Sequence, residues 1–467
     1  MASFPRVLSG RAWRAGAPAL LVIGMLTGCP ANGDDLQPPR DELVYPTGLA
    51  VSPDAARLFV VNANSDLRWS SGSVVAFDLD AVDELVSRWI SLAVEDRGCQ
   101  DQDGPLAGGP CSCDPENPAI LWCDQARVAD AGAGVRVGNF ATDIAIQDLG
   151  DGDLRLFVPV RGDPSVTWID YRGGQLACDG SGEGFPFCDE ERILGFAGDS
   201  TRDLIEEPFE VFVDSASEVA VVTHLQLGAV SLIQTPRDGT PALVDALTGL
   251  FENLVLSNGA VIAGAAIGAA GRRVPGSEDT LFYITSRTDD RVQMLAVAPP
   301  RGSVPAQLVP AGFFLLDSVQ PSDDSRGIAF NADGTRAYMV NRNPPMLHVV
   351  DTSTTPAGVP ANEIIASVDL CRDPANLAVA GAGEDTRVYV ACFPEGQVWA
   401  VDPEASVVEA ILSVGGGPNA VAVDQQRKRL YVASFLDHSV TVVDLDPASP
   451  ARNQVVLRLR SSQEGDN

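Results

Sequence analysis

Short apolar runs, rich in β-branched side chains and bounded by polar turn residues, recur along this chain. The clearest set lies near the end, at Pro418–Asp424, Arg429–Ser434 and Ser439–Asp444, and a further apolar run covers 455–460. Short β-branched runs of this kind, bounded by turn residues, predict strands. Each set therefore predicts four short antiparallel strands.

The same set occurs seven times, with first strands beginning near residues 46, 144, 208, 261, 328, 374 and 418. In five copies the aromatic residue of the second strand precedes the first apolar residue of the third by nine positions: Phe157/Val166, Tyr283/Val292, Tyr338/Leu347, Tyr389/Val398 and Tyr431/Val440. In five copies an aspartate ends the third strand: Asp78, Asp170, Asp351, Asp402 and Asp444. Fourth strands are expected at 86–92, 364–370, 407–414 and 455–460. Four strands every forty to fifty residues are typical of propeller blades, so we predict an all-β chain with a single seven-bladed β-propeller of four-stranded blades over 43–460.

The strongest copies carry Arg-Leu-Tyr-Val-Ala at 429–433, Ser-Val-Thr-Val-Val-Asp at 439–444 and Ala-Asp-Gly at 332–334. With these motifs the chain resembles the YVTN family of β-propeller repeat proteins. The resemblance implies a ring of seven blades. It does not imply one activity, because related propellers serve in surface layers, lactone hydrolysis and quinone-dependent oxidation.

The first 28 residues have the composition of a bacterial lipoprotein signal peptide. Arg6, Arg11 and Arg14 precede an apolar run at 15–26, which is too short to span a bilayer. Leu-Thr-Gly-Cys at 26–29 resembles a lipobox, which implies cleavage before Cys29 and lipidation of that residue. Residues 29–42 are then a flexible tether and 461–467 a C-terminal tail. This predicts a cell-envelope protein, lipid-anchored in the outer membrane, facing either the periplasm or the outside.

The charge of the chain argues against one class of partner. The formal net charge is −31, and Lys428 is the only lysine. Nucleic-acid binding requires basic residues that displace counterions, so no nucleic-acid partner is expected.

Eight cysteines remain besides Cys29, an even number that suits disulfides in an oxidising compartment. Cys371 and Cys392 lie at adjoining ends of two predicted antiparallel strands, and Cys178 and Cys188 close a short loop. Cys99, Cys111, Cys113 and Cys123 lie in a Gly/Pro-rich insertion at 93–138, where three pairings are open. A zinc site is the alternative there, but the insertion has no histidine and its Cys-x-Cys spacing is unusual for zinc. We expect disulfides and no metal site.

The turns that enter each first strand and join the second strand to the third share one end of a propeller, here called the upper face. The 93–138 insertion is expected on this face, between the first and second blades. The repeat register places there six residues of candidate ligand-binding character: Arg161, His224, Arg287, Arg342, Phe393 and Phe435. Arginines that converge in so acidic a chain predict a funnel for an anionic ligand or a protein carboxylate. The alternative is that these arginines pair with local aspartates on solvated turns.

No catalytic motif is recognisable, and the three histidines lie in different blades without metal-ligand spacing. We therefore name no catalytic residue and no cofactor, and favour a binding or scaffold protein over an enzyme. Its insert-bearing face would bind a protein, glycan or anionic partner of the cell envelope, in an oligomeric state that the sequence leaves open. The alternatives are a lactonase-like hydrolase acting on an anionic sugar lactone and a quinoprotein-like oxidoreductase.

Overall fold

The computed structural model describes residues 36–92, 111–114, 117–178, 185–195, 204–274, 277, 279–316 and 323–461. The chain divides into two units, Met1–Leu36 and Gln37–Asn467, and the architecture below is that of the second unit. The predicted signal peptide, Cys29 and Cys99 lie outside the described residues.

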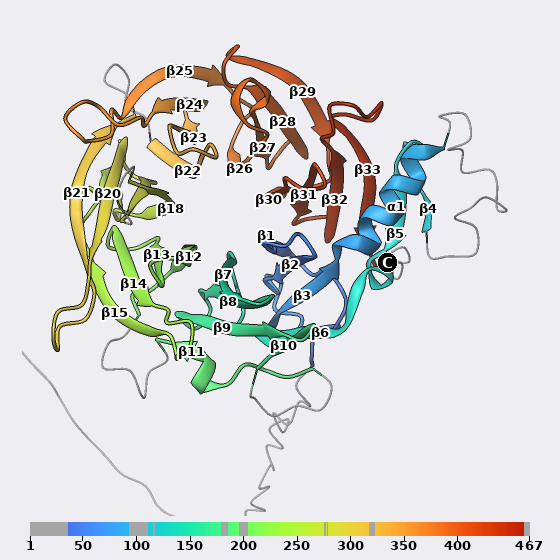
Figure 1. Ribbon diagram of the computed structural model, residues 1–467, viewed down its shortest axis with the longest axis horizontal. Coiled ribbons are helices and arrows are strands. Elements are labelled where there is room, and N and C mark those ends of the chain that lie inside the picture. Colours follow the sequence, from blue (N-terminus) through green and yellow to red (C-terminus); the bar gives the residue numbers. More distant parts are fainter. Residues whose placement is uncertain are drawn as a thin grey trace, which may run out of the picture. The chain divides into compact units, whose positions relative to one another are not determined.

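Seven antiparallel sheets of four strands form a β-propeller of seven blades, which confirms the predicted fold (Figure 1). From blade 1 to blade 4 the strands are β1 (Pro46–Val51), β2 (Arg57–Asn62), β3 (Gly72–Asp78) and β6 (Ala129–Val137); β7 (Ala145–Gly150), β8 (Asp153–Val160), β9 (Ser165–Arg172) and β10 (Gln175–Ala177); β12 (Pro208–Asp214), β13 (Val219–His224), β14 (Ala229–Gln234) and β15 (Ala242–Leu247); β18 (Ala266–Arg273), β19 (Thr280–Ser286), β20 (Arg291–Ala298) and β21 (Gln307–Leu315). Blades 5 to 7 comprise β22 (Asp323–Phe330), β23 (Arg336–Asn343), β24 (Pro345–Asp351) and β25 (Glu363–Asp369); β26 (Pro374–Ala380), β27 (Arg387–Cys392), β28 (Gln397–Asp402) and β29 (Val407–Ser413); β30 (Pro418–Asp424), β31 (Arg429–Ser434), β32 (Ser439–Asp444) and β33 (Gln454–Arg460).

The aspartates that end the third strands have partners that the repeat explains. In five blades an arginine at or near the start of the second strand forms an ion pair with this aspartate: Arg57–Asp78, Arg155–Asp170, Arg336–Asp351, Arg387–Asp402 and Arg429–Asp444. The antiparallel register places the two residues opposite each other. These arginines therefore hold the lower ends of the blades together.

The core lies between neighbouring blades, where aromatic residues of the second strands are buried. Tyr283, Tyr338 and Tyr431 are at most 2% exposed. The Tyr283 hydroxyl donates to Asn362 Oδ1 at 2.9 Å, and the Tyr389 hydroxyl donates to Asn453 Oδ1 at 2.8 Å. Each bond joins one blade to the next. It also gives a buried tyrosine hydroxyl the hydrogen-bond partner that it needs.

The strand predicted at 86–92 is wrong, because this segment belongs to a helix, α1 (Leu79–Ser91). Its buried residues follow a helical period: Leu79, Val82, Leu85, Val86 and Trp89. Asp78 caps the helix, since its carboxylate accepts the N–H groups of Asp80 and Ala81 at 2.9 and 3.0 Å. One aspartate thus ends a strand, pairs with Arg57 and starts a helix.

The outer strand of blade 1 is instead β6, which lies within the predicted 93–138 insertion. The excursion from β3 to β6 starts at the lower end of blade 1, so its expected place on the upper face is wrong. On the way it forms β5 (Leu121–Asp124), which pairs in parallel with β33 of blade 7, and β4 (Cys111–Cys113), which pairs with β5. The excursion therefore binds the outer edge of the last blade, beside α1 (Figure 1).

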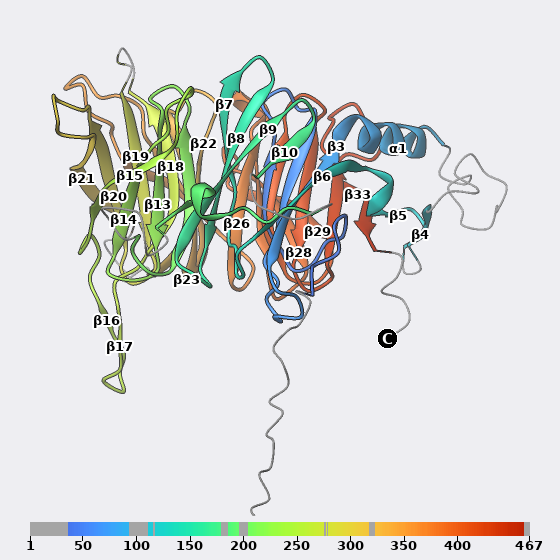
Figure 2. The same cartoon turned by 90° about the horizontal axis from the view of Figure 1, so that it is seen from below.

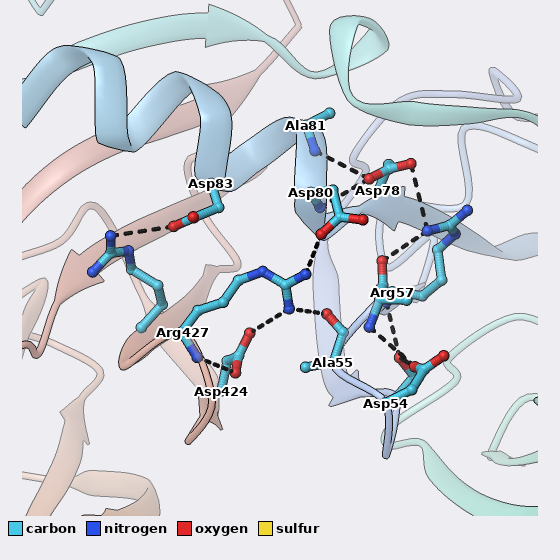
Figure 3. A network of polar contacts seen from close by, with 12 residues as sticks. Asp54, Ala55, Arg57, Asp78, Asp80, Ala81, Asp83, Asp424 and Arg427 are labelled. Atoms are coloured by element: carbon cyan, nitrogen blue, oxygen red, sulfur yellow. Dashed lines mark hydrogen bonds and ion pairs between the residues drawn. The ribbon is translucent and has the colours of Figure 1, made fainter.

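Polar contacts close the ring where blade 7 meets blade 1 (Figure 3). Arg427 bonds to Asp80 of α1, to the backbone oxygen of Ala55 and to Asp424. Arg429 bonds to Asp83, one turn further along α1, at 3.2 Å. The first and last blades are thus joined by side chains and by β5.

The fourth blade begins later than predicted, at Ala266 rather than near Val261. The residues before it form a small hairpin of β16 (Leu254–Val255) and β17 (Val261–Ile262). This hairpin connects β15 to β18 on the upper face and extends well beyond the neighbouring turns (Figure 2, where this face points down). No helix in the described part of the chain is both long and apolar enough to cross a membrane.

Candidate functional site in the central channel

The first strand of each blade lines the channel, and an irregularity at its start directs side chains inward. In six blades the pairing of first and second strands shifts near the second residue, as between Pro46 and Gly48 or between Pro208 and Val211. A bulge of this kind turns a side chain away from the regular alternation of a strand.

A cavity of about 60 Å³ lies among these strand starts. All seven blades contribute to its lining, which consists of Thr47, Thr142, Asp143, Phe209, Glu210, Ile267, Arg326, Gly327, Arg342, Ala375, Asn376 and Asn419. Such a volume holds a few water molecules or one small chemical group.

Hydrogen bonds between neighbouring blades hold this wall in place. Thr47 Oγ1 donates to the backbone oxygen of Ala141 at 2.8 Å, and Thr142 Oγ1 donates to that of Phe209 at 2.5 Å. Asn419 Nδ2 donates to the backbone oxygen of Thr47 at 3.1 Å, across the closure of the ring. The side chains that line the cavity therefore stand on a rigid support.

Two carboxyl groups from adjacent blades face the same cavity. Asp143 precedes β7, and Glu210 lies on β12. Asp143 Oδ2 accepts the N–H of Val211 at 3.0 Å, which connects it to the strand of Glu210. A Cβ atom on Gly48 would approach the backbone carbon of Asp143 to 2.9 Å, so the glycine allows blade 1 to pack closely here.

The surroundings favour the protonated forms of both acids. Burial raises the pKa of Asp143 to about 6, although the N–H groups of Val211 and Ile144 act to lower it. Burial, followed by the charge of Asp143, raises the pKa of Glu210 well above its usual range. Two interacting carboxyl groups in such a site share a proton over part of the pH range, so one can donate a proton while the other accepts one.

Arginines of blade 5 contribute the opposite charge to the cavity. Arg326 Nε lies 2.6 Å from Asp324 Oδ1, and Arg342 Nε donates to the backbone oxygen of Pro374 at 2.9 Å. Burial lowers the pKa of Arg342 to about 10, with Arg326 and Arg287 acting in the same direction and Asp324 and Asp373 against it. Arg342 remains cationic at neutral pH. The repulsion between it and the neighbouring arginines, Arg326 and Arg287, favours a bound anion.

The six predicted ligand-binding residues do not form one funnel. Arg342 lines the cavity, and Arg287 is close enough for its charge to affect Arg342. Arg161 Nε instead donates to Glu207 Oε2 at 2.6 Å, a carboxylate beside the next blade rather than a local aspartate.

His224 is fully buried, with Nε2 2.8 Å from Ser231 Oγ and Nδ1 3.2 Å from the backbone oxygen of Glu206. Burial lowers its pKa to about 4. His224 is therefore neutral at physiological pH and supplies no charge for an anion.

The two predicted aromatic residues belong to a cluster on the upper rim. The ring centroids of Phe393 and Phe435 are 6.3 Å apart, and that of Tyr45 is 5.0 Å from Phe435 and 4.3 Å from His438. This cluster joins blades 6, 7 and 1 and lies beside the channel opening.

Three disulfides are present among the described residues. Cys371–Cys392 and Cys178–Cys188 confirm the predicted pairs, and Cys111–Cys123 joins β4 to β5. Cys113 is also disulfide-bonded. Within the described ranges no group of three or more His, Cys, Asp or Glu side chains could hold a metal ion.

Sequence reasoning missed Asp143, Glu210 and Arg326, although the repeat contained a signal for them. At the start of each blade, where four of the copies carry Pro-x-x-aliphatic, the residue before the apolar one is Gly48, Asp143, Glu210, Gly268, Gly327, Asn376 and Ala420 in turn. Acids occupy this position only in blades 2 and 3, which are neighbours. A comparison of the copies column by column would have placed both carboxyl groups at the channel.

No protein-family model and no curated protein matches the chain. Solved structures match its fold. A provisionally assigned 6-phosphogluconolactonase from Bacteroides fragilis has a TM-score of 0.54 at 12% identity, with 87% of this chain and 98% of that chain covered. Hydrazine synthase from Kuenenia stuttgartiensis has a TM-score of 0.52 at 13% identity, with 90% and 99% covered. A second provisionally assigned 6-phosphogluconolactonase, from Bacteroides uniformis, has a TM-score of 0.50 at 13% identity, with 74% and 89% covered. At such identities the shared feature is the propeller fold.

Proposed function

We propose that this protein is a lactonase-like hydrolase that opens a small anionic lactone at the upper end of its channel. The carrying observation is the pair Asp143 and Glu210, whose pKa values are raised in a cavity that Arg326 and Arg342 also line. The sequence alone favoured a binding protein. The buried acid pair changes that preference, because clusters of perturbed acids are typical of catalytic sites.

The chemistry requires one base and one acid. The ionised carboxylate accepts a proton from water as the water oxygen attacks the lactone carbonyl carbon. The protonated carboxyl group then donates its proton to the ring oxygen as the ester bond breaks, which leaves a hydroxy acid. The net reaction adds one water to the lactone. It leaves the two acids with exchanged protonation states, and proton exchange with solvent restores the original states.

The arginines would bind charge rather than transfer protons. The side chains of Arg326 and Arg342 are 15% and 23% exposed, so their charges act in a partly desolvated site. There they can hold a phosphate or carboxylate of the substrate, or stabilise the oxyanion of the attacked carbonyl. The small cavity suits the water and the reacting group, and a sugar ring would lie at the rim above it, near Arg287.

Two of the matched propellers carry the provisional assignment 6-phosphogluconolactonase. A phosphorylated sugar lactone combines the ester and the negative charge that this site would require. The match supports the proposal through fold only, and the acid pair supports it through chemistry.

The test is hydrolysis of sugar lactones, with and without phosphate, measured as acid release above the spontaneous rate. The full chain with Cys29→Ser is compared with Asp143→Asn, Glu210→Gln and Glu363→Gln. Glu363 is an exposed carboxylate on β25, far from any channel-facing first strand, and serves as the matched control. We expect the first two substitutions to reduce kcat at least a hundredfold and the third to leave it unchanged. Equal activity of all four proteins, or no activity of the parent on any lactone, would reject the proposal.

A binding role is the second candidate, favoured by the aromatic cluster of Tyr45, Phe393, Phe435 and His438 beside the cationic rim. Aromatic rings next to arginines are typical of interface centres and of sugar-binding surfaces. Affinity capture from cross-linked envelopes, with the parent and a Phe393→Ser/Phe435→Ser variant, would test it. Recovery of one partner by the parent alone would support a protein- or glycan-binding role.

The location proposed for the protein is the cell envelope, with a lipid on Cys29 and the outer membrane as its site. The disulfides among the described residues suit an oxidising compartment. Incorporation of labelled fatty acid into the parent and not into a Cys29→Ser variant would support the anchor. Equal labelling of both would reject it.

A further inference from the structure

The β16–β17 hairpin is apolar, uncharged and exposed. Val255 is 65% exposed, Leu256 38% and Val261 60%. No Asp, Glu, Lys or Arg occurs between Glu252 and Arg272, in a chain where one residue in five is charged. Soluble surfaces seldom retain such a cluster of aliphatic side chains unless it contacts an apolar partner.

The hairpin is built to project. Its register pairs Leu254 with Ile262 and Val255 with Val261. The turn is closed by backbone bonds from Leu256 N–H to Ala260 O at 2.8 Å and from Gly259 N–H to Leu256 O at 2.9 Å. Asn258 Oδ1 accepts the N–H of Ala260 at 2.9 Å, so the polar groups of the tip largely satisfy one another. Paired backbone groups can enter an apolar phase at little cost.

The hairpin extends from the upper face, and the chain enters the propeller on this same face. Asn62 at the upper end of β2 accepts the N–H of Val44 at 2.9 Å and donates to the backbone oxygen of Glu42 at 3.0 Å. Cys29, the proposed lipid site, precedes Glu42 by 13 residues. Even fully extended, a segment of that length spans only about 45 Å. An anchored propeller would therefore keep its upper face near the bilayer.

We propose that the β16–β17 hairpin inserts its tip into the lipid bilayer and forms a second membrane contact beside the lipid anchor. Leu227 is 58% exposed and is followed by Gly228, which donates its N–H to the backbone oxygen of Gly264 at the hairpin base. It extends the apolar patch onto the propeller. Each strand has two residues, and the four residue steps from Leu254 to Asn258 at the tip reach at most about 13 Å, which takes the tip through the headgroups to the acyl boundary.

A bilayer fits this hairpin better than a protein partner does. Protein interfaces are typically centred on Trp, Tyr and Arg, and the stretch from Leu254 to Ile262 has none of them. A net charge of −31 would repel an anionic membrane surface, so contact must come from an apolar element that reaches past the headgroups. The hairpin lies between blades 3 and 4, at the edge of the ring. Its insertion would hold the propeller by one side and leave the channel opening accessible to water.

The test places a polarity-sensitive fluorophore at the tip. Ser257→Cys is labelled in the lipid-anchored full chain reconstituted into vesicles of phosphatidylethanolamine and phosphatidylglycerol. Glu404→Cys, an exposed turn residue of blade 6 at the opposite face, carries the same label as the control. We expect a blue shift and quenching by brominated lipid at 257 and neither at 404. Val255→Asp/Val261→Asp should abolish both signals while the lipid still holds the chain on the vesicle.

Salt dependence separates this contact from electrostatic docking. Because the contact is apolar and the body is acidic, raising the salt concentration should strengthen insertion into anionic vesicles. Two results together would overturn the proposal in favour of a protein partner. The label at 257 would show no blue shift on vesicles, and residues 254–262 would be protected from hydrogen exchange only in whole envelopes. Neither result depends on the channel chemistry, so the failure of one proposal is distinguishable from the failure of the other.

Discussion

Asp83 on helix α1 and Arg429 at the start of β31 lie 3.2 Å apart although 346 residues separate them in sequence. The same arginine lies 2.5 Å from Asp444, whose side chain is completely buried. Arg429 thus continues the arginine–aspartate pairs of the repeat and also joins the last blade to the first. In blade 2 Arg155 likewise reaches the next blade, through the backbone oxygens of Pro236 and Gly239. In blade 7 the contact with the next blade closes the ring.

Replacement of Arg429 should therefore cost more than replacement of an exposed basic residue. Arg429→Met leaves Asp444 without its cation in a buried position, which typically costs about 3–5 kcal/mol of the free energy of unfolding. The neighbouring Lys428 pairs with Asp446 in solvent, so Lys428→Met should cost less than about 1 kcal/mol. Denaturant unfolding of both variants measures the difference. Equal small losses would mean that the closure does not depend on this pair.

The acid pair in the channel should destabilise the fold at neutral pH. The pKa of Asp143 is raised from 3.8 to about 6, so the folded state binds protons more tightly than the unfolded state and stability falls as pH rises through this range. Asp143→Asn removes the penalty and keeps an oxygen that can accept the N–H of Val211. We expect it to raise the free energy of unfolding by up to about 3 kcal/mol at pH 8 and to change it little at pH 4.

The Glu363→Gln variant is the control for this experiment, since its carboxylate lies in solvent. A loss of stability in Asp143→Asn at pH 8 would contradict the raised pKa. A gain in stability combined with a loss of lactone hydrolysis would show that the fold tolerates these acids because the chemistry requires them.

His224 should have the opposite dependence on pH over nearly the same range. Its pKa is lowered from 6.5 to about 4, so the unfolded state binds the proton more tightly and stability is lost as pH falls from 6.5 toward 4. The loss amounts to about 3 kcal/mol at pH 4. In the parent this slope opposes that of Asp143, and the two partly cancel.

Single substitutions should reveal the cancelled slopes. In His224→Gln stability should fall as pH rises from 4 to 6, because only the acid pair remains. In Asp143→Asn the curve should be flatter than in the parent, because burial still raises the pKa of Glu210 and its slope opposes that of the histidine. The comparison uses slopes, so a constant loss caused by the buried glutamine does not affect it. Parallel pH curves for parent and His224→Gln would show that His224 is not buried neutral.

Most of the fold followed from periodicity. Strands such as Arg429–Ser434 and Ser439–Asp444 are short β-branched runs bounded by turn residues, and the spacing of the aromatics and aspartates repeats, so blade number and strand order could be predicted. Helix α1 was missed because Val86, Trp89 and Ile90 also suit a strand. The helical spacing shows only when the segment is extended back to its cap, Asp78.

The site was harder to predict because a ring brings together residues that are distant in sequence. Arg287 and Arg342 were placed near the opening from the register of the second strands. The register shift at the start of β12 turns Glu210 into the channel, and Asp143 lies just ahead of β7, so no regular strand pattern announces either side chain. His224 was placed near the upper opening as a ligand-binding residue, but it is fully buried and its ring nitrogens lie against Ser231 and the backbone oxygen of Glu206.

The excursion that forms β4 and β5 should protect the outer edge of blade 7. Leu457–Arg460 pair with Leu121–Asp124, whereas in the described structure the outer side of β29 has no strand partner. Arg458 Nη1 donates to Asp114 Oδ2 at 2.9 Å and holds the excursion in place.

The backbone amides of β33 should therefore exchange with solvent at least tenfold more slowly than those of β29. Arg458→Met should remove most of this difference, because it takes the cation away from the largely buried Asp114, whereas Arg372→Met, at an exposed pair with Glu395, should not. Hydrogen exchange measured residue by residue decides the matter. If β33 and β29 already exchange alike in the parent, β5 does not stay paired in solution, and the ring is closed by α1 and its arginines alone.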